Sequence, residues 1–348
     1  MSQRSLVVSQ IGAPMVFIDR AIPEPKEGEV LVKVEVAGLN PHDSSSRSYG
    51  LFIADILPTP LAIDIVGTVT KVGPGVSKFA IGDQIFTQGW PTDPDQCGTQ
   101  EYAIALADVS AKVPVGISGD DAATLALNPY TAFVGLFGND GLGIPPPFGT
   151  PEAGSFDYAS QQILIIGGGS ACGKFAIQWS KYAGIGTIVA VASKIKGEAE
   201  LKRLGATHVI DRHGTLDEID YEIREVVGDD LVYALDCVSS GPGEHTLGVR
   251  ALSSSKRGKL AVLVRTASVD ETKIGEKRAG YERRPILADP SIPGLSKPYW
   301  EMVPGWIEGQ VITPTPFSVI EGLDADKVNE ALDGYRDGRP VAKPQIHI

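Results

Sequence analysis

The stretch from Ile163 to Gly184, ILIIGGGSACGKFAIQWSKYAG, limits what this chain can fold into more than any other part of it. A strand-like apolar run is followed by glycines at 167, 168, 169 and 173 and then by a helical pattern with one apolar face. Small residues let a phosphate approach the backbone, and a helix N-terminus offers unpaired N–H groups and a positive dipole end. The pattern predicts a strand, turn and helix that cradle a pyrophosphate. Its spacing is one residue longer than the common fingerprint, so a glycine turn that binds nothing is the alternative.

The end of the next strand, TIVAVAS, predicts which dinucleotide is bound. A site for NADH usually has an Asp or Glu about twenty residues past the glycines. Here Ser193 is followed by Lys194 and Lys196, and the first acid is Glu198. A carboxylate would repel a 2′-phosphate, whereas a hydroxyl and two ammonium groups attract it. We therefore predict NADPH as the cofactor. The alternative is that both lysines are ordinary solvated residues at a helix start.

Length and composition set the class of protein. A chain of 348 residues with 43% hydrophobic and 21% charged residues predicts a folded protein of two domains. The net charge of −12 argues against nucleic acid or an anionic membrane as a main partner. No apolar run has the length of a membrane span, and the N-terminus lacks a signal-peptide core. The three cysteines, Cys97, Cys172 and Cys237, are far apart in the sequence, which favours a reducing, cytoplasmic location.

The pattern along the chain changes twice. To about Asp108 it is strand-like with frequent Gly, Pro and Asp turns, and over Ser118–Phe137 it is helical. After a proline-rich loop, strands and helices alternate, which predicts an α/β domain with a doubly wound parallel sheet. Thr266–Pro298 is polar and has no clear period. The helices expected after the loop are 171–182, 198–204, 216–227, 245–252 and 324–335.

Several strings in this order resemble the medium-chain dehydrogenase/reductase superfamily: GEVLVKVEVAGLNPHD, LPTPLAIDIVGTVTKVGPGVSKFAIGDQIF, the glycine turn, LKRLGATHVID and YALDCV. LNPHD, the proline-rich loop, GGS and YALDC resemble more narrowly the fungal trans-acting enoyl reductases, such as the partner of the lovastatin nonaketide synthase, and the ToxD-type proteins. The resemblance implies a GroES-like β-rich catalytic domain over 1–125 and an NADPH-binding Rossmann domain over 126–305. Residues 306–348 would return to the catalytic domain.

The resemblance also bears on metal binding. Zinc-dependent members of the superfamily place Cys or His at positions that correspond here to Asn40, Ile63 and about Leu127. An isoleucine and a leucine do not ligate zinc, and asparagine is a poor substitute for a thiolate. The chain has no CxxC pair, which excludes a four-thiolate zinc site. We therefore expect no metal, including at His42.

The resemblance implies cofactor contacts in several segments. Cys172 lies inside the phosphate turn, where a helix N-terminus could lower its pKa, although packing under the helix is the simpler role. Ser44 and Ser45 depart from the side chains that the polyketide-associated enzymes carry after the N-P-x-D motif. The implied cofactor contacts are His42, Asp43, Ser44, Ser45, Gly169, Ser170, Ala171, Cys172, Gly173, Lys174, Ser193, Lys194, Lys196, Arg212, Ala251, Leu252, Val341 and Ala342.

The same resemblance implies a substrate segment and candidate proton donors. Tyr49 lies near the tyrosine acid of related zinc-free reductases, but its spacing from Asn40 is shorter by about two residues, so a packing tyrosine is the alternative. Asn128 and Tyr130 are the other candidates, and Asn128 could instead turn the chain before Pro129. The implied substrate segment is Leu127, Asn128, Pro129, Tyr130, Thr131 and Ala132.

Without a metal, the chemistry that remains accessible is hydride addition to a C=C bond conjugated to a carbonyl. We therefore predict an NADPH-dependent, zinc-independent enoyl reductase, acting on a small or carrier-bound enoyl substrate with a polyketide synthase as possible partner. A quinone or alkenal reductase and an NADPH-binding accessory or sensor protein without turnover are the alternatives. The charged, proline-broken Thr266–Pro298 segment disfavours edge pairing and so favours a monomer over a homodimer.

Overall fold

The computed structural model describes residues 2–149 and 151–348, and the chain forms two compact units. Unit 1 extends to Leu127 and resumes at Asp289, and unit 2 comprises Asn128–Ala288. The first division lies beside the predicted boundary at 125 and 126. At the second, residues 289–305 belong to unit 1, ahead of the predicted return at 306.

Unit 1 is built from two sheets. The smaller has the order β2-β1-β4, with β1 at Ser2–Val8, β2 at Val16–Ala21 and β4 at Thr59–Pro60. The larger has the order β15-β16-β3-β5-β6-β8, and β7 also pairs with β3. Its strands are β3 (Glu29–Gly38), β5 (Asp64–Val72), β6 (Gln84–Gln88), β7 (Tyr102–Leu106), β8 (Ser110–Lys112), β15 (Phe317–Ile320) and β16 (Lys343–His347).

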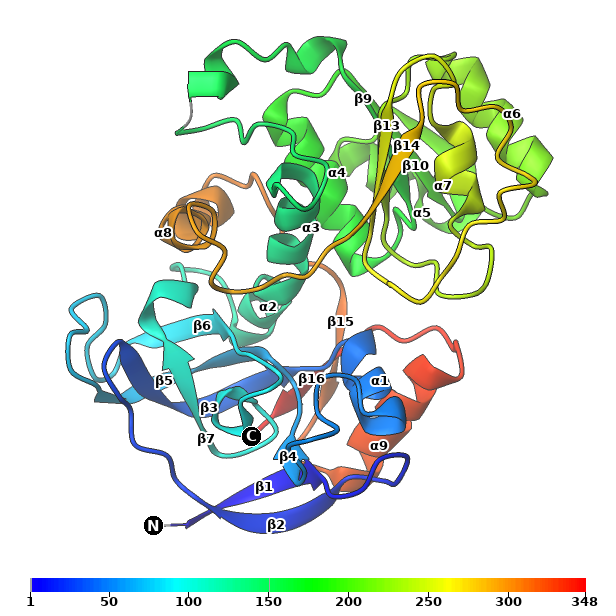
Figure 1. Ribbon diagram of the computed structural model, residues 1–348. Helices are drawn as coiled ribbons and strands as arrows, with labels where there is room; N and C mark the ends of the chain where they lie inside the picture. Colours follow the sequence, from blue (N-terminus) through cyan, green and yellow to red (C-terminus); the bar gives the residue numbers. More distant parts are fainter. Residues whose placement is uncertain (1, 150) are drawn as a thin grey trace. The chain divides into compact units, whose positions relative to one another are not determined.

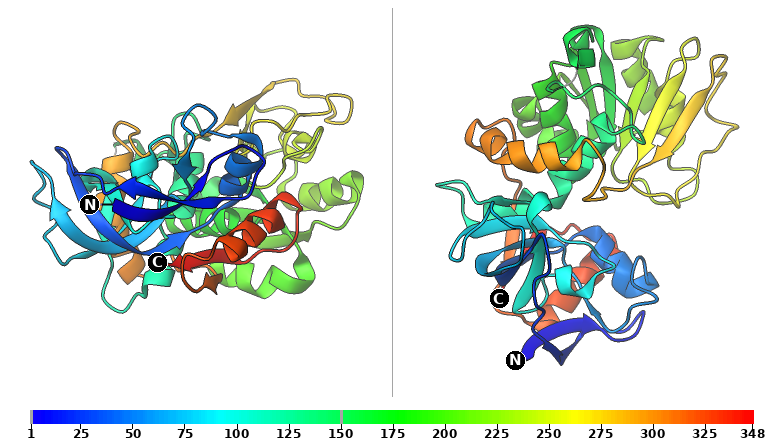
Figure 2. Two further views of the ribbon diagram at one scale, coloured as in Figure 1. Left: turned by 90° about the horizontal axis from the view of Figure 1, so that it is seen from below. Right: turned by 60° about the vertical axis from the view of Figure 1, so that its left-hand side comes forward.

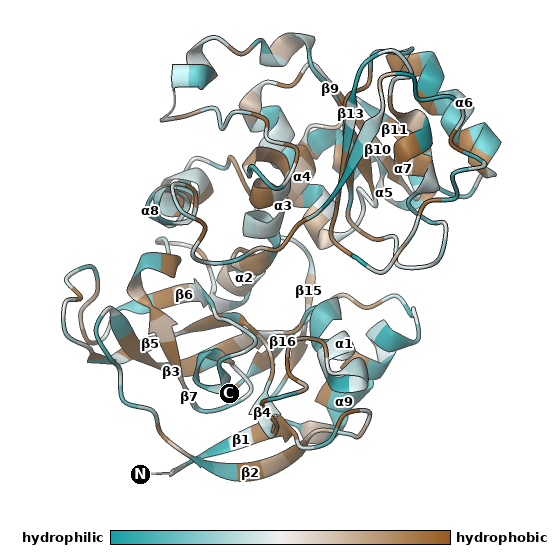
Figure 3. Ribbon diagram, viewed as in Figure 1, coloured by the Kyte–Doolittle hydropathy of each residue, from teal (hydrophilic) through white to brown (hydrophobic). Residues whose placement is uncertain are grey.

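The helices of unit 1 bring the two ends of the chain together. Helix α1 (Pro41–Tyr49) lies beside α9 (Ala325–Arg336), as Figures 1 and 2 show, and the Ser44 hydroxyl donates to the Leu332 carbonyl at 2.7 Å. The other two are α2 (Gly119–Thr124) and α8 (Ser296–Glu308). Apolar side chains of β1, β3, β5 and α9 share one core, which is why Figure 3 shows hydrophobic colouring along β3 and β5.

Unit 2 is a parallel sheet of order β11-β10-β9-β12-β13-β14, the arrangement of a Rossmann domain. The α/β fold class is confirmed. The Thr266–Pro298 segment, in which no clear structure was predicted, supplies the edge strand β14, whose backbone pairs with β13. The strands are β9 (Gln162–Ile166), β10 (Thr187–Ala192), β11 (His208–Asp211), β12 (Tyr233–Asp236), β13 (Gly258–Val262) and β14 (Tyr281–Pro285).

Helices cover both faces of this sheet, as Figure 1 shows for α4 and α6. Two expectations are corrected. The helical region Ser118–Phe137 is two helices, α2 and α3, because Pro129 has no N–H to bond the Leu125 carbonyl. Helix α5 begins at Lys194 rather than Glu198, because helical hydrogen bonding already starts where the Gly197 amide donates to the Ser193 carbonyl at 3.1 Å. The helices are α3 (Leu127–Phe137), α4 (Ala171–Ala183), α5 (Lys194–Leu204), α6 (Leu216–Val227) and α7 (Thr246–Ala251).

Short 3₁₀ turns complete the described chain, at Pro94–Gln96, Ala107–Val109, Pro151–Gly154 and Tyr158–Ser160. Across residues 2–149 and 151–348, no helix combines the length and the apolar character needed to cross a bilayer.

Candidate functional site

The glycine turn of unit 2 follows β9 and opens α4, at the point where the strand order reverses between β9 and β12. Gly167 and Gly168 both donate to the Val191 carbonyl at 3.0 Å, which anchors the turn to β10. The Ser170 side chain accepts from the Gly173 amide at 3.1 Å. Within the described residues, the amides of Gly169, Ala171 and Cys172 have no acceptor. Three N–H groups at the positive end of a helix dipole are therefore available to an anion.

Glycine occupies two positions of this turn for different structural reasons. A Cβ at Gly173 would lie 2.2 Å from the Gly167 carbonyl oxygen, so only glycine lets α4 pack this closely against the turn. A Cβ at Gly169 would meet only the Ala192 Cβ, at 3.8 Å. Gly169 is exposed and has space above it, as the approach of a phosphate requires. The Lys174 ammonium points to α5, where it pairs with Glu200 at 2.8 Å.

The predicted 2′-phosphate contacts lie at the start of α5. Ser193 makes no capping hydrogen bond with its hydroxyl, and Lys194 and Lys196 are exposed in the first helical turn. Arg212 is exposed after β11, and its amide donates to the Ala192 carbonyl at 2.9 Å. Asp211, the last residue of β11, was not predicted from the sequence.

The Asp211 carboxylate is partly neutralised by its neighbours. Its Oδ1 lies 2.7 Å from Nδ1 of His213, and it also accepts from the Lys194 amide. These contacts, the His213 hydrogen bond foremost, lower the pKa of Asp211. The surface at the end of β10 and β11 therefore presents the engaged Asp211 carboxylate beside the exposed basic side chains of Lys194, Lys196 and Arg212.

The predicted substrate segment at the start of α3 packs against α4. The Trp179 indole donates to the Pro129 carbonyl at 2.9 Å, and the Cys172 thiol donates to the Asn128 carbonyl at 3.7 Å. Tyr130 is 0% exposed and lies in the core, whereas Asn128 is half-buried. The Cys237 thiol hydrogen-bonds to Cys172, and this contact together with burial raises the pKa of Cys237.

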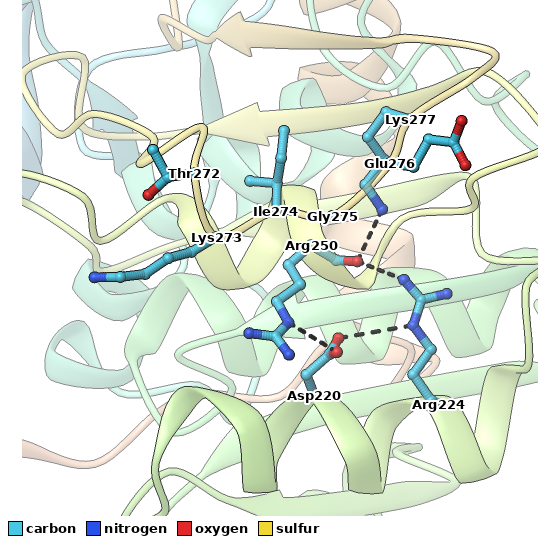
Figure 4. Close-up of a pocket in the computed structure, with 9 residues that line it drawn as sticks. All are labelled: Asp220, Arg224, Arg250, Thr272, Lys273, Ile274, Gly275, Glu276 and Lys277. Atoms are coloured by element: carbon cyan, nitrogen blue, oxygen red, sulfur yellow. Dashed lines mark hydrogen bonds and ion pairs between the residues drawn. The ribbon is translucent and has the colours of Figure 1, made fainter.

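The segment Ala251–Leu252 is buried at the end of α7, beside a surface cavity of about 460 Å³. Figure 4 shows how the cavity's basic side chains are used: Arg224 and Lys277 both donate to the Arg250 carbonyl, and Arg250 pairs with Asp220. Burial, and next the Arg224 charge, lowers the pKa of Lys277 to about 8. Arg224 and Lys277, which line this cavity, therefore cap the C-terminal carbonyls of α7. The basic side chains of the cavity are already paired with groups of the protein itself.

Unit 1 contains a group of buried polar side chains, here called the Asp64 cluster: Asn40, Asp43, Asp64, Lys343 and Gln345. The Lys343 ammonium pairs with the Asp64 carboxylate and donates to Oδ1 of Asn40 at 2.8 Å. The side-chain amide nitrogen of Asn40, Nδ2, donates to Oδ2 of Asp64 at 2.7 Å. Asp64 is 0% and Lys343 6% exposed, so this ion pair is shielded from water.

The Asp64 cluster connects three of the segments predicted to form the site. Asn40 is the N-cap residue of α1, which carries His42, Asp43, Ser44 and Ser45. The Leu127 amide, at the start of the substrate segment, donates to Oδ1 of Asp64 at 2.6 Å. Lys343 follows Val341 and Ala342 directly. One carboxylate therefore holds the beginnings of α1, α3 and β16.

The side chains predicted along α1 divide into two groups. Asp43 is buried, and its carboxylate accepts from the backbone amides of Asn40 at 2.7 Å and Ala62 at 2.9 Å. Ser44 is buried against Leu332. His42 and Ser45 are partly exposed. Tyr49, a candidate proton donor, is 76% exposed at the end of α1.

The three positions that correspond to zinc ligands lie at the Asp64 cluster. Asn40 is a member, Ile63 precedes Asp64, and Leu127 bonds to it. Among residues 2–149 and 151–348 there is no group of three or more His, Cys, Asp or Glu side chains placed to hold a metal ion. Asp64, Lys343 and Gln345 were missed from the sequence, although a charge at Asp64 inside the apolar run LAIDIVG was a usable signal.

Comparison with known proteins identifies the family. Residues 26–130 match the alcohol dehydrogenase GroES-like domain, and residues 171–263 match the zinc-binding dehydrogenase family. The trans-enoyl reductase tazE of Aspergillus terreus is 30% identical over 70% of this chain and 79% of its own length. The trans-enoyl reductase grgB of a Penicillium species is 27% identical over 99% of this chain and 97% of its own. The chain therefore belongs to the medium-chain dehydrogenase/reductase superfamily, in the family of the trans-enoyl reductases, and it is an oxidoreductase.

Solved structures share the fold over the whole chain. The CurK enoyl reductase superposes with a TM-score of 0.79 at 20% identity, covering 99% of each chain. A mycobacterial protein solved in complex with NADPH superposes with a TM-score of 0.75 at 21% identity, over 99% of this chain and 100% of its own. The GroES-like and Rossmann assignments made from the sequence are confirmed.

Proposed function

We propose that this protein is an NADPH-dependent, zinc-independent reductase of a C=C bond conjugated to a carbonyl, with an enoyl thioester as its substrate. The observation that carries the proposal is the turn of unit 2, whose three available amides precede the basic start of α5. The family supports the reaction class, because relatives along the whole chain are named trans-enoyl reductases. One solved structure of the same fold holds NADPH.

The residues present fit the cofactor. The amides of Gly169, Ala171 and Cys172 would bind the pyrophosphate, and Ser193, Lys194, Lys196 and Arg212 would bind the 2′-phosphate. When bound, NADPH would supply a hydride to the β-carbon of the substrate, whose carbonyl oxygen would then carry the negative charge of an enolate. His42 and Ser45, and the segments 251–252 and 341–342, are proposed to contact its nicotinamide half.

The chain must then stabilise the enolate and protonate its α-carbon. A hydrogen-bond donor near the carbonyl oxygen stabilises the negative charge as it develops. Asn128 is half-buried at the start of α3 and fits this role. Tyr49 has an exposed phenol and is the proposed proton donor ahead of Tyr130, which lies in the core. A thioester tethered to a polyketide synthase is the proposed physiological form of the substrate, and the protein is proposed to act as a monomer.

The proposal is tested by the absorbance of the nicotinamide band. NADPH and NADH are compared with crotonyl-pantetheine, quinones and 2-alkenals in parallel. We expect oxidation of NADPH by the enoyl thioester and much slower oxidation of NADH. Faster turnover of quinones or alkenals would instead support the alternative reductase, and tight NADPH binding without turnover would support an accessory protein. One zinc ion per chain after dialysis would contradict the metal-free mechanism.

A further inference from the structure

Lys343 differs from the other lysines discussed above because its ammonium is buried between two partners. It pairs with Asp64 and donates to the Asn40 amide oxygen, and its side chain is almost completely shielded from solvent. A buried ammonium is costly to desolvate and persists where its partners compensate for lost hydration. An apolar side chain would also fill this buried position in β16, so the presence of a charge there requires an explanation.

The partners of Lys343 explain where its charge acts. Asp64 also accepts from the Leu127 amide at 2.6 Å, and Asn40 also donates to Asp64 at 2.7 Å. Asn40 and Leu127 each stand at the start of a segment that the proposed function uses, because α1 begins after Asn40 and α3 begins at Leu127. Removing the ammonium would leave a buried carboxylate with only neutral donors and would release both segments from one fixed arrangement.

Gln345 indicates that the surroundings of Lys343 are suited to a cation. Strand β16 pairs Gln345 with Gly38, and a Cβ at Gly38 would lie 2.8 Å from Oε1 of Gln345 and 3.1 Å from Cε of Lys343. Within the described residues the buried Gln345 amide has no hydrogen-bond partner. The end of the lysine is therefore enclosed by polar groups: the oxygens of Asp64 and Asn40 accept from its ammonium, and the Gln345 amide, unpaired among the described residues, lies close by.

We propose that Lys343 is a positioning residue whose internal ammonium holds the starts of α1 and α3 in the arrangement needed for reduction. Its cationic charge compensates the buried carboxylate of Asp64, which also accepts from the Asn40 side chain and from the Leu127 backbone amide. The inference deepens the proposed function and rests on it for the consequence in catalysis. The structural part, an ammonium-specific internal site, stands without it.

The test replaces the lysine and then returns its charge as a small molecule. Lys343→Ala should lower the melting temperature by about 5–15 °C and reduce kcat for the enoyl thioester at least tenfold. Added propylammonium or ethylammonium should recover at least half of both losses, because its N–H groups can reach Asp64 and Asn40. Tetramethylammonium, which cannot donate, should recover neither. Lys71→Ala is the matched control, since Lys71 forms an exposed pair with Glu24 and its loss should change nothing.

A second variant keeps the test decisive if Lys343→Ala does not fold. The double substitution Asp64→Asn, Lys343→Met removes both charges and should fold, yet it should keep the loss of kcat. Full activity of this neutral variant, or recovery by tetramethylammonium as good as by propylammonium, would overturn the proposal.

Measurements of ligand affinity distinguish a positioning role of Lys343 from a general loss of structure in Lys343→Ala. The fragment 2′,5′-ADP would use only the unit 2 residues, so its affinity for Lys343→Ala should match the wild type. Affinity for whole NADPH should fall severalfold, because α1 and β16 carry the contacts proposed for its other half. Equal losses for both ligands would contradict a positioning role. Wild-type protein that binds neither would disprove the proposed function, while the recovery of the melting temperature by alkylammonium would still test the internal site.

Discussion

The phosphate turn of unit 2 and the Asp64 cluster of unit 1 are built in opposite ways. The turn is made of residues close together in the sequence, and its proposed function depends on small side chains and backbone amides between Gly167 and Gly173. The Asp64 cluster joins residues far apart in the sequence, Asn40, Asp64 and Lys343, through buried side-chain contacts. The turn leaves backbone donors available to a ligand, whereas the Asp64 cluster pairs its charges within the protein. Substitutions in the turn should therefore act mainly on binding, and substitutions in the Asp64 cluster mainly on stability and geometry.

The largest expected effect is that of Asp64→Asn. It leaves the Lys343 ammonium buried without its counter-charge, and breaking a buried ion pair costs about 3–5 kcal/mol of folding free energy. Urea unfolding measures the change. Glu24→Gln is the control, because the Glu24–Lys71 pair is exposed and should contribute less than about 1 kcal/mol. A loss below about 1 kcal/mol for Asp64→Asn would show that the Asp64 cluster does not hold unit 1 together.

Gly173→Ala should come next. The added Cβ would lie 2.2 Å from the Gly167 carbonyl oxygen and 2.8 Å from the Gly168 Cα, so the backbone must shift. We expect a loss of about 1–3 kcal/mol in stability together with loss of NADPH binding.

Gly169→Ala is the matched substitution in the same turn. Its methyl group finds space in the protein, so stability should change by less than about 0.5 kcal/mol. NADPH affinity, measured by fluorescence titration, should nevertheless fall about tenfold, because the methyl occupies the approach of the phosphate. Unchanged affinity in Gly169→Ala would refute the turn as the pyrophosphate site.

Replacing both Lys194 and Lys196 by Gln tests the choice of dinucleotide. Loss of two charge-assisted contacts to the 2′-phosphate should lower kcat/KM for NADPH by about 10- to 100-fold and leave that for NADH unchanged. Lys202→Gln is the control on the same helix, since Lys202 pairs with Glu198. Equal effects on both cofactors would show that the two lysines are ordinary surface residues.

The smallest expected effect is a pH dependence at Lys277. Its pKa in the folded state is lowered to about 8, chiefly by burial, from an ordinary value near 10.5. Between these values the unfolded chain binds more protons, so stability should rise as pH increases from about 8 to 10.5. Below pH 8 the unfavourable burial of the charge is fully present.

Lys277→Met isolates this effect. At pH 7 the melting temperature of Lys277→Met should be higher than that of the wild type. At pH 9.5 this difference should be lost. An advantage that is the same at both pH values would contradict the assigned titration.

The same contrast explains what the sequence could predict. The glycine turn and the parallel sheet could be predicted because each depends on neighbouring residues and on a short period. The Asp64 cluster could not, since nothing local at Lys343 or Gln345 indicates that β16 pairs with β3 and carries them to Asn40. The break at Leu125 was missed because the effect of Pro129 outweighed the hydrophobic period. The start of α5 at Lys194 was missed because residues 194–197 have no buried side chain to mark that period. Strand β14 was missed because its sequence, YERRP, is polar and lies at a sheet edge.

Transfer of a labelled hydride tests the central claim most directly. The protein, freed of metal by a chelator, is mixed with NADPH deuterated at nicotinamide C4 on either face and with crotonyl-pantetheine. The account predicts butyryl-pantetheine with one deuterium at the β-carbon, from one of the two faces only, at a rate that added zinc does not change. Product without deuterium at that carbon, or turnover that appears only when zinc is restored, would contradict it.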